Sequence, residues 1–297
     1  MRRLRQIIAE RLHGLYSDRE LKALTIELCR SLPGVRENDF YLDTVLQPSS
    51  EREDLLNDWL ERLASGEPLQ YVIGCTEFCG CRIHCDYRAL IPRPETSELV
   101  EWVAEENGSD AVPETSRKLI DIGTGAGCIA IALARKLQGW NISAWDISND
   151  ALSLAAGNCR ENGVTVHLEQ RDVMKVANGD VSCLKCCAGE RNLCPVHIIV
   201  PNPPYITERE KVAMESNVLD YEPHLALFVP DEDPLRFYRA IAELGTGCLD
   251  DDGALYFEIN PLYADEMVEM LGGMGYSSTL RCDIQGRKRM LKAQKIL

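Results

Sequence analysis

Residues 118–134 read KLIDIGTGAGCIAIALA, and this stretch decides the fold. A short apolar strand ends at Ile122, glycines follow at 123, 125 and 127, and an apolar helix starts at Cys128. A glycine-rich turn between a strand and a helix lets a ligand approach the backbone, and the first N–H groups of the helix point towards that ligand. The turn lacks both the G-x-G-x-x-G spacing and a phosphate-loop lysine, so by itself it is also compatible with a tight connection that binds nothing.

Strands and helices alternate on the C-terminal side of this turn. Strands are predicted over 141–145, 165–170, 197–200 and 254–259, a helix capped by Ser148 over 149–162, and an antiparallel hairpin over 279–297. Such alternation indicates right-handed crossovers and a parallel sheet covered by helices on both faces. The predicted fold class is therefore α/β, with a doubly wound sheet closed by an antiparallel hairpin.

The N-terminal part has a different pattern. Residues 1–67 are predicted to form a small bundle of amphipathic helices, because leucines recur at helical spacing and two capping-box patterns occur, Ser17 with Glu20 and Ser50 with Glu53. Residues 70–92 alternate like strands, including Tyr71-Val72-Ile73, and the segment 68–96 is predicted to form a β-hairpin and interdomain linker. Residues 97–297 then form the α/β domain, and residues 107–117 are predicted to be a polar loop in it. The bundle is either a support or a domain that docks a partner.

Composition excludes several classes of protein. The chain has 297 residues with 32 Lys and Arg against 47 Asp and Glu, a net charge of -15, which argues against a broad nucleic-acid surface. No segment reaches the roughly 18 apolar residues of a membrane span. The 13 cysteines are an odd number without a secretory signal, so reduced thiols and a cytoplasmic location are expected. A zinc half-site in the cysteine-rich loop (Cys183, Cys186, Cys187, Cys194) has no matching second pair, so no metal is predicted.

Two acids follow the strands next to the glycine turn. Asp146 ends the second predicted strand, where a carboxylate can accept both hydroxyls of a ribose. Asp172 lies near the end of the third, where it can accept from an adenine amino group while Val173 packs on the ring. Taken singly, each acid could be a helix cap or a surface group. With the glycines they predict an adenosine cofactor, either S-adenosylmethionine or NAD.

The tetrapeptide Asn202-Pro203-Pro204-Tyr205 directly follows the fourth strand. A residue before proline is pushed out of the α region, and each proline fixes its own φ. The result is a stiff hook that can aim two acceptors, the Asn202 side-chain oxygen and the Pro203 carbonyl, at one point. Tyr205 adds a flat aromatic face.

The two acceptors of this hook would suit a planar NH2 group. An amide nitrogen is a poor nucleophile because its lone pair is delocalised. Acceptors that pull on its hydrogens stabilise the positive charge that it gains during attack, which is preorganised electrostatic catalysis. The same Asn-Pro pair is also plain turn chemistry.

These motifs together resemble the protein-(glutamine-N5) methyltransferases that modify class 1 peptide-chain release factors. The resemblance covers nearly the whole chain, and the segments that carry it are PLQYVIG (68–74), LIPRPET (90–96), DIGTGAG (121–127), NPPYI (202–206) and DYEP (220–223). The first part of NPPYI is shared with amino-group DNA methyltransferases. LIPRPET is much more specific to the glutamine group.

The resemblance implies a helical domain at 1–67 that docks the release factor and a Rossmann-like domain at 97–297 that binds S-adenosylmethionine and leaves S-adenosylhomocysteine. Gly123, Thr124, Gly125, Ala126 and Gly127 would hold the methionine portion, Asp146 the ribose, and Asp172 with Val173 the adenine. Asn202, Pro203, Pro204 and Tyr205 would hold the glutamine amide, with Asn202 also against the cofactor. Leu90 would lie near the cofactor, and Arg93 and Glu95 would fix the interdomain segment. Val173 departs from the aromatic residue common in the family, which weakens the expected stacking.

Other functions remain open on the sequence alone. A glutamine methyltransferase that acts on a ribosomal protein would share these motifs and differ in its docking domain. An adenine-N6 DNA methyltransferase would need base flipping and a positive groove, which the net charge disfavours. An NAD dehydrogenase would leave the Asn-Pro-Pro-Tyr hook without a purpose. An adenosine-binding scaffold without activity would not need the acceptor at Asn202.

Overall fold

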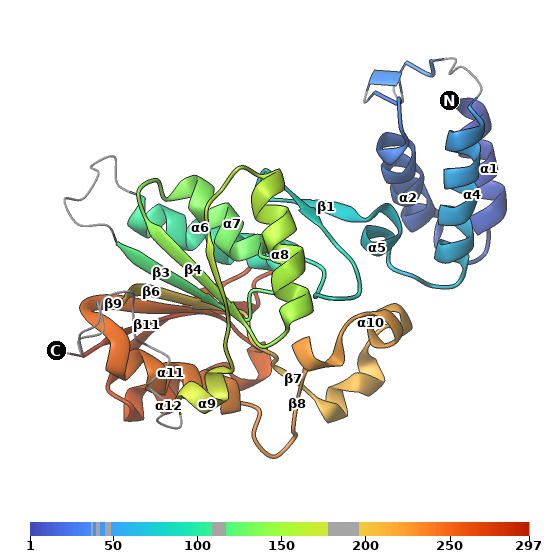
Figure 1. Ribbon diagram of the computed structural model, residues 1–297. Coiled ribbons are helices and arrows are strands. Elements are labelled where there is room, and N and C mark those ends of the chain that lie inside the picture. Colours follow the sequence, from blue (N-terminus) through green and yellow to red (C-terminus); the bar gives the residue numbers. More distant parts are fainter. Residues whose placement is uncertain (37, 40–41, 45–48, 109–116, 178–195, 297) are drawn as a thin grey trace. The chain divides into compact units, whose positions relative to one another are not determined.

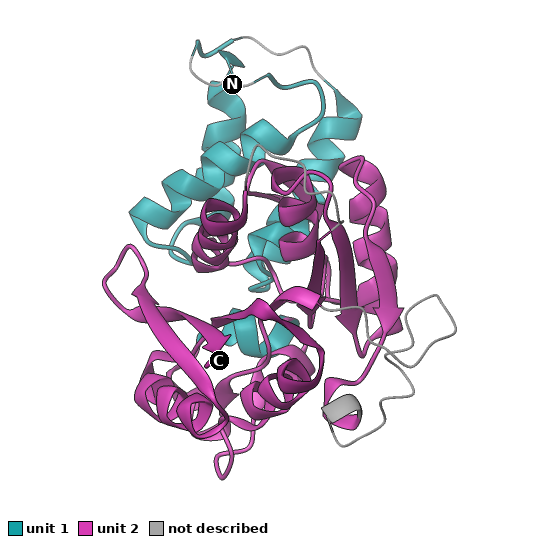
Figure 2. Cartoon of the chain, turned by 90° about the vertical axis from the view of Figure 1, so that its left-hand side faces the viewer, with its two compact units in different colours: residues 1–75, 215–221 teal, residues 76–214, 222–297 magenta. Residues whose placement is uncertain are grey.

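The computed structural model describes residues 1–36, 38–39, 42–44, 49–108, 117–177 and 196–296. These residues form two compact units, coloured separately in Figure 2. The first unit contains residues 1–75 and 215–221, and the second contains 76–214 and 222–297. The segment 68–96, predicted as hairpin and linker, is thus divided between the two units at Cys75.

The first unit is helical, as its sequence predicts. Its helices are α1 (Arg2–Leu12), α2 (Asp18–Ser31), α4 (Ser50–Ala64), α5 (Leu69–Ile73) and α10 (Ser216–Tyr221). The capping box at the start of α2 is present, with Glu20 N–H donating to the Ser17 hydroxyl and Ser17 N–H donating to the Glu20 carboxylate. Leucines and isoleucines of α1, α2 and α4 pack with Trp59 into one buried core. Each helix is too short to be stable alone, so this shared core holds the bundle together.

Two local predictions in this unit are wrong. Residues 71–73 form part of helix α5 rather than a strand, and the helix ends at Gly74, which has a φ of +82°. A short apolar run fits either structure, and here the left-handed glycine stops a helical turn. The cap of α4 is Ser49 rather than Ser50, because the Ser49 hydroxyl accepts from Arg52 N–H at 3.3 Å.

The second unit is built on a seven-stranded sheet with the order β10-β11-β9-β6-β3-β4-β5 (Figure 1). The strands are β3 (Lys118–Ile122), β4 (Asn141–Asp146), β5 (His167–Gln170), β6 (Val196–Pro201), β9 (Leu249–Glu258), β10 (Tyr276–Cys282) and β11 (Lys288–Lys295). Strands β5, β4, β3, β6 and β9 are parallel to one another, whereas β11 runs antiparallel to both β9 and β10. This confirms the predicted α/β class with its closing hairpin.

Helices cover both faces of this sheet (Figure 1). One face carries α6 (Pro94–Asn107), α7 (Cys128–Lys136) and α8 (Asn149–Glu161), and the other carries α9 (Val173–Ala177), α11 (Arg236–Cys248) and α12 (Ala264–Gly273). The central strands are buried on both sides, so β3 and β6 read as continuous apolar runs. The strand order reverses between β3 and β6, and ligands of such sheets bind at the carboxyl ends of the strands there.

Short elements complete the second unit. The hairpin β1 (Cys75–Phe78) and β2 (Cys81–His84) packs on α7 and α8. Strands β7 (Ile206–Thr207) and β8 (Phe228–Val229) pair after the hook. In the described part of this unit, 3-10 helices that connect other elements are η2 (Glu208–Ala213), η3 (His224–Ala226) and η4 (Pro261–Tyr263). Of the predicted loop at 107–117, residues 109–116 lie outside the described part of the chain.

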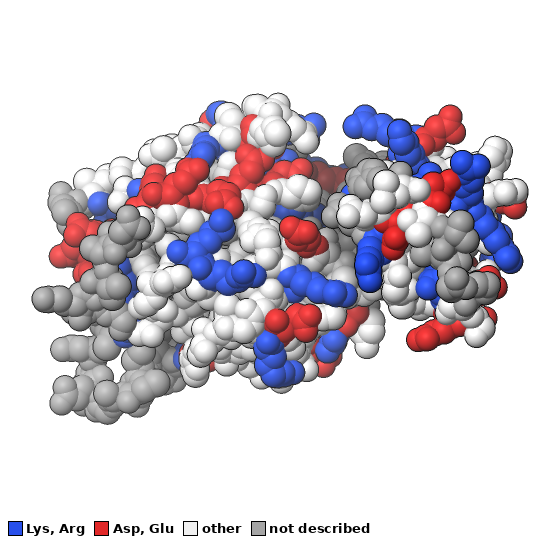
Figure 3. All heavy atoms as spheres, turned by 90° about the horizontal axis from the view of Figure 1, so that it is seen from above, with Lys and Arg blue, Asp and Glu red and all other residues white. Residues whose placement is uncertain are grey.

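Charged side chains of both signs lie interspersed on the face shown in Figure 3. Acids of α6 pair with lysine and arginine side chains of neighbouring elements, namely Glu101 with Lys136, Glu105 with Arg281 and Glu106 with Lys292. These local pairs reduce repulsion among the acids of α6, although the net charge of the chain stays at -15. Among the described residues, no helix is long and apolar enough to cross a membrane.

Candidate active site

The glycine turn connects the end of β3 to the start of α7. All three glycines adopt positive φ angles, +76° at Gly123, +55° at Gly125 and +84° at Gly127, which other residues rarely adopt. A Cβ atom at Gly123 would lie 3.6 Å from the Asn202 carbonyl oxygen, and one at Gly127 would lie 3.1 Å from the Ala155 Cβ. The turn therefore lies beside the hook at Gly123, where glycine is required by the positive φ, whereas the third glycine also lets α7 pack closely on α8.

A buried acid supports the turn from behind. Asp121 in β3 is fully buried, and its Oδ2 accepts from the Thr124 hydroxyl at 2.6 Å and from Ala130 N–H at 3.2 Å. Its Oδ1 has no hydrogen-bond partner among the described residues. Burial raises the pKa of Asp121 to about 7. Sequence reasoning gave Asp121 no role, although an acid inside an apolar strand was a usable signal.

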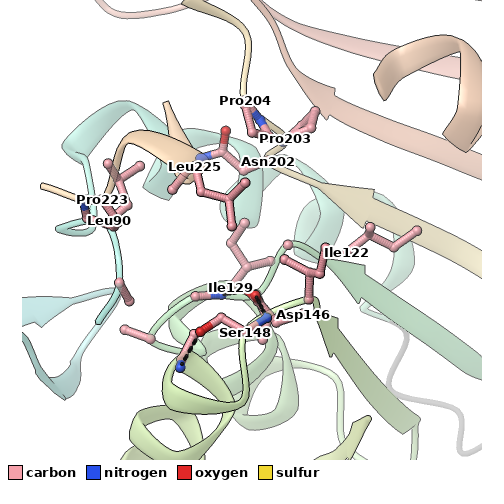
Figure 4. Close-up of a pocket in the computed structure, with 18 of the residues that line it drawn as sticks. Leu90, Ile122, Ile129, Asp146, Ser148, Asn202, Pro203, Pro204, Pro223 and Leu225 are labelled. Carbon is pink, nitrogen blue, oxygen red and sulfur yellow. Dashed lines mark hydrogen bonds between the residues drawn. The ribbon is translucent and has the colours of Figure 1, made fainter. Parts of the chain in front are cut away.

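Asp146 lies at the carboxyl end of β4 and lines the cavity beside the turn, as predicted (Figure 4). Its Oδ2 accepts from Gly125 N–H at 2.8 Å, and its Oδ1 accepts from Ser148 N–H at 2.9 Å. Burial raises the pKa of this carboxyl group. A carboxylate has about four lone-pair sites, so Asp146 keeps acceptor capacity for a further donor.

Asp172 and Val173 follow β5 and line the same cavity. The Asp172 Oδ1 accepts from Met174 N–H at 3.0 Å, so this acid caps the start of α9 as well as facing the cavity. The Val173 side chain packs against the large core of the second unit. The structure therefore brings together the glycine turn and the acids that follow β4 and β5.

The hook follows β6 directly. Asn202, Pro203 and Pro204 line the cavity on the side opposite Asp146 and Ser148 in Figure 4. Tyr205 is not among the lining residues: its hydroxyl donates to Glu258 Oε1 at 3.1 Å and its ring packs against the core. Its expected contact with a planar substrate group stays a prediction. Gly127 likewise does not line the cavity, whereas the other four residues of the turn do.

A further acid, Glu222, connects two segments at the rim of the cavity. Glu222 is 4% exposed, and its carboxylate accepts from Ile91 N–H at 3.1 Å and from the Arg93 guanidinium at 2.5 Å. This joins the segment around Leu90 to the segment that contains Pro223 and Leu225, and all three of these residues line the cavity. Two motifs that carry the family resemblance, LIPRPET and DYEP, thus meet through Glu222.

The cavity carries little free positive charge. Three arginines line it, and each pairs with an acid: Arg88 with Asp86, Arg93 with Glu222 and Arg171 with Glu169. Phosphate sites normally present unpaired cationic groups. The paired arginines and the apolar lining around Ile122 and Ile129 suit a largely neutral ligand.

Sequence reasoning missed a buried asparagine that ties the β1–β2 hairpin to the turn. Asn158 in α8 is fully buried, accepts from His84 N–H at 2.8 Å and donates to the carbonyls of His84 and Ala126. The sequence did contain a signal for this role, because Asn158 falls on the apolar side of an amphipathic helix. The four cysteines at 183, 186, 187 and 194 lie outside the described residues, within which no cluster of metal ligands occurs.

Comparison with known proteins gives consistent matches. Residues 105–184 match the family model described as "Methyltransferase small domain". The chain is 43% identical to a release factor glutamine methyltransferase from Bacteroides thetaiotaomicron, with 99% of this chain and 100% of that protein covered. It is 40% identical to one from Flavobacterium psychrophilum, covering 84% and 85%.

Solved structures agree on the fold. The catalytic domain of hMettl16, solved with an RNA hairpin of the MAT2A 3'UTR, superposes with a TM-score of 0.51 at 15% identity, covering 85% of this chain and 84% of that one. The delta-N METTL16 methyltransferase domain gives 0.50 at 19% identity, covering 71% and 87%. These matches confirm the predicted Rossmann-like methyltransferase fold.

Proposed function

The chain belongs to the release factor glutamine methyltransferase family, and from this we propose that it transfers a methyl group from S-adenosylmethionine to the side-chain nitrogen, N5, of a release-factor glutamine. The substrate is the glutamine of the Gly-Gly-Gln motif in class 1 release factors. One observation carries the proposal: the Asn-Pro-Pro hook and the glycine turn line one cavity, with the Asn202 carbonyl next to Gly123.

The residues around the turn fit the cofactor. Gly123 and Gly125 leave open backbone against which the methionine portion can lie, because their positive φ angles disfavour any residue with a side chain. Asp146 keeps acceptor capacity for the ribose hydroxyls, and Asp172 with Val173 would contact the adenine. When bound, S-adenosylmethionine supplies an electrophilic methyl group on a positively charged sulfur.

The hook would activate the substrate amide. The Asn202 side-chain oxygen and the Pro203 carbonyl accept the two amide hydrogens, which draws electron density onto the nitrogen and stabilises its developing positive charge. The alkylated nitrogen is acidic and loses its proton readily, so no strong general base is required. The remaining demand on the protein is to hold nitrogen, methyl carbon and sulfur in line.

The same proposal assigns partners and location. The helical unit would dock the release factor, and the enzyme would act in the cytoplasm, where release factors meet ribosomes. Because the arginines around the cavity are paired with acids, they favour a neutral protein side chain over a DNA substrate whose phosphates would need cationic partners.

The experiment is methyl transfer from labelled S-adenosylmethionine to purified release factors, followed by mass mapping. We expect one methyl group on the Gly-Gly-Gln glutamine and none on a release factor in which that glutamine is replaced by alanine. Parallel reactions with ribosomal proteins and with duplex DNA test the two alternative substrates. Label that appears only on a ribosomal protein or on adenine would refute the proposal.

A further inference from the structure

Glu258 is a buried acid that lies behind the hook. It is the last residue of β9. In the parallel pairing of β6 with β9, Ile199 lies opposite Leu255, so three residues further along both strands Asn202 and Glu258 lie at the same level. Glu258 is 1% exposed and accepts one hydrogen bond on each oxygen, from the Thr96 hydroxyl at 2.6 Å and from the Tyr205 hydroxyl at 3.1 Å. Both ends of the hook are therefore close to one carboxylate.

The Thr96 hydroxyl connects this acid to Asn202. Thr96 is the third residue of α6, is 2% exposed and lines the cavity. Its oxygen lies 3.5 Å from the Asn202 side-chain nitrogen. A hydroxyl has one hydrogen, and that of Thr96 is given to Glu258, so its oxygen can only accept. The group of Asn202 that faces Thr96 must then be the NH2.

This direction matters because the two ends of an asparagine amide have nearly the same shape. Rotation by 180° exchanges an oxygen that accepts for an NH2 that donates. An NH2 aimed into the cavity would face the hydrogens of the substrate amide and repel them. The carboxylate of Glu258 accepts only, so it sets the direction of the whole chain from Asn202 through Thr96.

We propose that Thr96 and Glu258 are positioning residues that fix the Asn202 amide with its oxygen towards the substrate nitrogen. This inference rests on the proposed function, since it assigns the orientation which amide activation needs. Glu258 does not line the cavity and its hydrogen bonds run to Thr96 and Tyr205, so it acts through Thr96 and not as a base on the substrate. Thr96 is the last residue of LIPRPET, and its role would be to orient the Asn202 amide for the reaction.

The start of α6 is held so that Thr96 stays in place. Pro94 occupies the first helical position, and Arg93 just before it is paired with Glu222. Proline at this position fixes φ for the helix, and the ion pair holds the chain that enters it. Thr96 is thus presented from a fixed helical turn rather than from a free loop.

The test compares Thr96→Val with Thr96→Ser. Valine keeps the shape and removes the hydroxyl, whereas serine keeps the hydroxyl. We expect Thr96→Val to lower kcat for release-factor methylation by roughly ten- to a hundredfold, with KM for the release factor and Kd for the cofactor nearly unchanged, because misorientation affects the transition state most. Thr96→Ser should restore most of kcat. Thr246→Val, which removes an exposed hydroxyl of α11 bonded to the Glu243 carbonyl, is the matched control.

A second readout does not depend on methyl transfer. The side-chain NH2 signal of Asn202, identified by its loss in Asn202→Ala, should shift in the 15N–1H spectrum of Thr96→Val and return in Thr96→Ser. An unchanged signal, or a Thr96→Val enzyme with wild-type kcat, would overturn the inference. A loss of kcat accompanied by weaker cofactor binding and not rescued by serine would also overturn it. A wild-type protein that methylates no release factor would refute the proposed function instead, and the spectrum would then decide the orientation alone.

Discussion

Asp121→Asn is a substitution whose effect depends on pH in a way that the structure specifies. Asp121 is fully buried in β3 beneath the glycine turn, and one of its oxygens has no partner among the described residues. Asparagine has nearly the same shape, and its oxygen can still accept from Thr124 and Ala130. The variant therefore removes the buried charge while it keeps the packing and the two hydrogen bonds.

The pKa of Asp121 gives the sign and size of the effect. Burial raises this pKa from 3.8 to about 7, so the folded chain binds the proton more tightly than the unfolded chain. Stability is then lost as pH rises from about 4 to about 7, because the unfolded state releases its proton first. Each pKa unit corresponds to about 1.4 kcal/mol, so the full penalty is roughly 4 kcal/mol. Between pH 5 and pH 8, ionisation of Asp121 should lower the free energy of unfolding by about 2 to 3 kcal/mol.

The free energy of unfolding of the second unit can be followed by hydrogen exchange in increasing urea. Mass spectrometry would measure the exchange of a peptide that covers β3. The stability of Asp121→Asn relative to wild type should increase from pH 5 to pH 8, with both proteins measured free of cofactor. Asp252→Asn removes the same charge from an exposed site of β9 and controls for net charge. A difference that stays flat or decreases over this range would refute the reasoning about Asp121.

Three further predictions concern the hook, the ribose acid and the helical bundle. Asn202→Ala should cost ~2.7–4 kcal/mol of transition-state stabilisation with a much smaller change in cofactor affinity, and loss of binding alone would show that the assigned role is wrong. Asp146→Ala should weaken cofactor binding in calorimetry by roughly ten- to a hundredfold, since a hydrogen-bonding carboxylate is lost; unchanged affinity would contradict its role. Ser49→Ala should reduce the free energy of urea unfolding by about 1 kcal/mol, whereas an equal loss in Ser50→Ala would contradict the observed cap.

The fold was predictable from the sequence wherever a local sequence pattern is compatible with only one backbone structure. The strand, glycine turn and helix at 118–136 follow from apolar runs separated by residues that adopt positive φ. The capping box at Ser17 was predictable because both of its hydrogen bonds join residues three positions apart. The hook was predictable because prolines restrict their own φ and the residue before them.

Other features depend on contacts that one sequence does not reveal. Residues 71–73 are an apolar run compatible with a strand or a helix, and packing in the first unit decides for α5. The two serines at 49 and 50 are equally good caps, so only the observed backbone separates them. The partners of Glu222 and Glu258 are 129 to 162 residues away from them along the chain, with the exception of Tyr205. No spacing rule connects residues at such separations.

Three acids, Asp121, Glu222 and Glu258, stand behind the turn, the rim and the hook respectively, and all are buried. A buried carboxylate destabilises a fold through desolvation, and the raised pKa values of Asp121 and Glu258 reflect that cost. An ionised carboxylate only accepts, so Glu222 and Glu258 in that form dictate the direction of every hydrogen bond that they receive, which a neutral hydroxyl or amide does not. Transfer of a methyl group between two aligned atoms gains more from fixed orientation than from a few kcal/mol of stability. Glu258→Gln should therefore preserve the shape of the cavity and still lower kcat for methylation of the release factor.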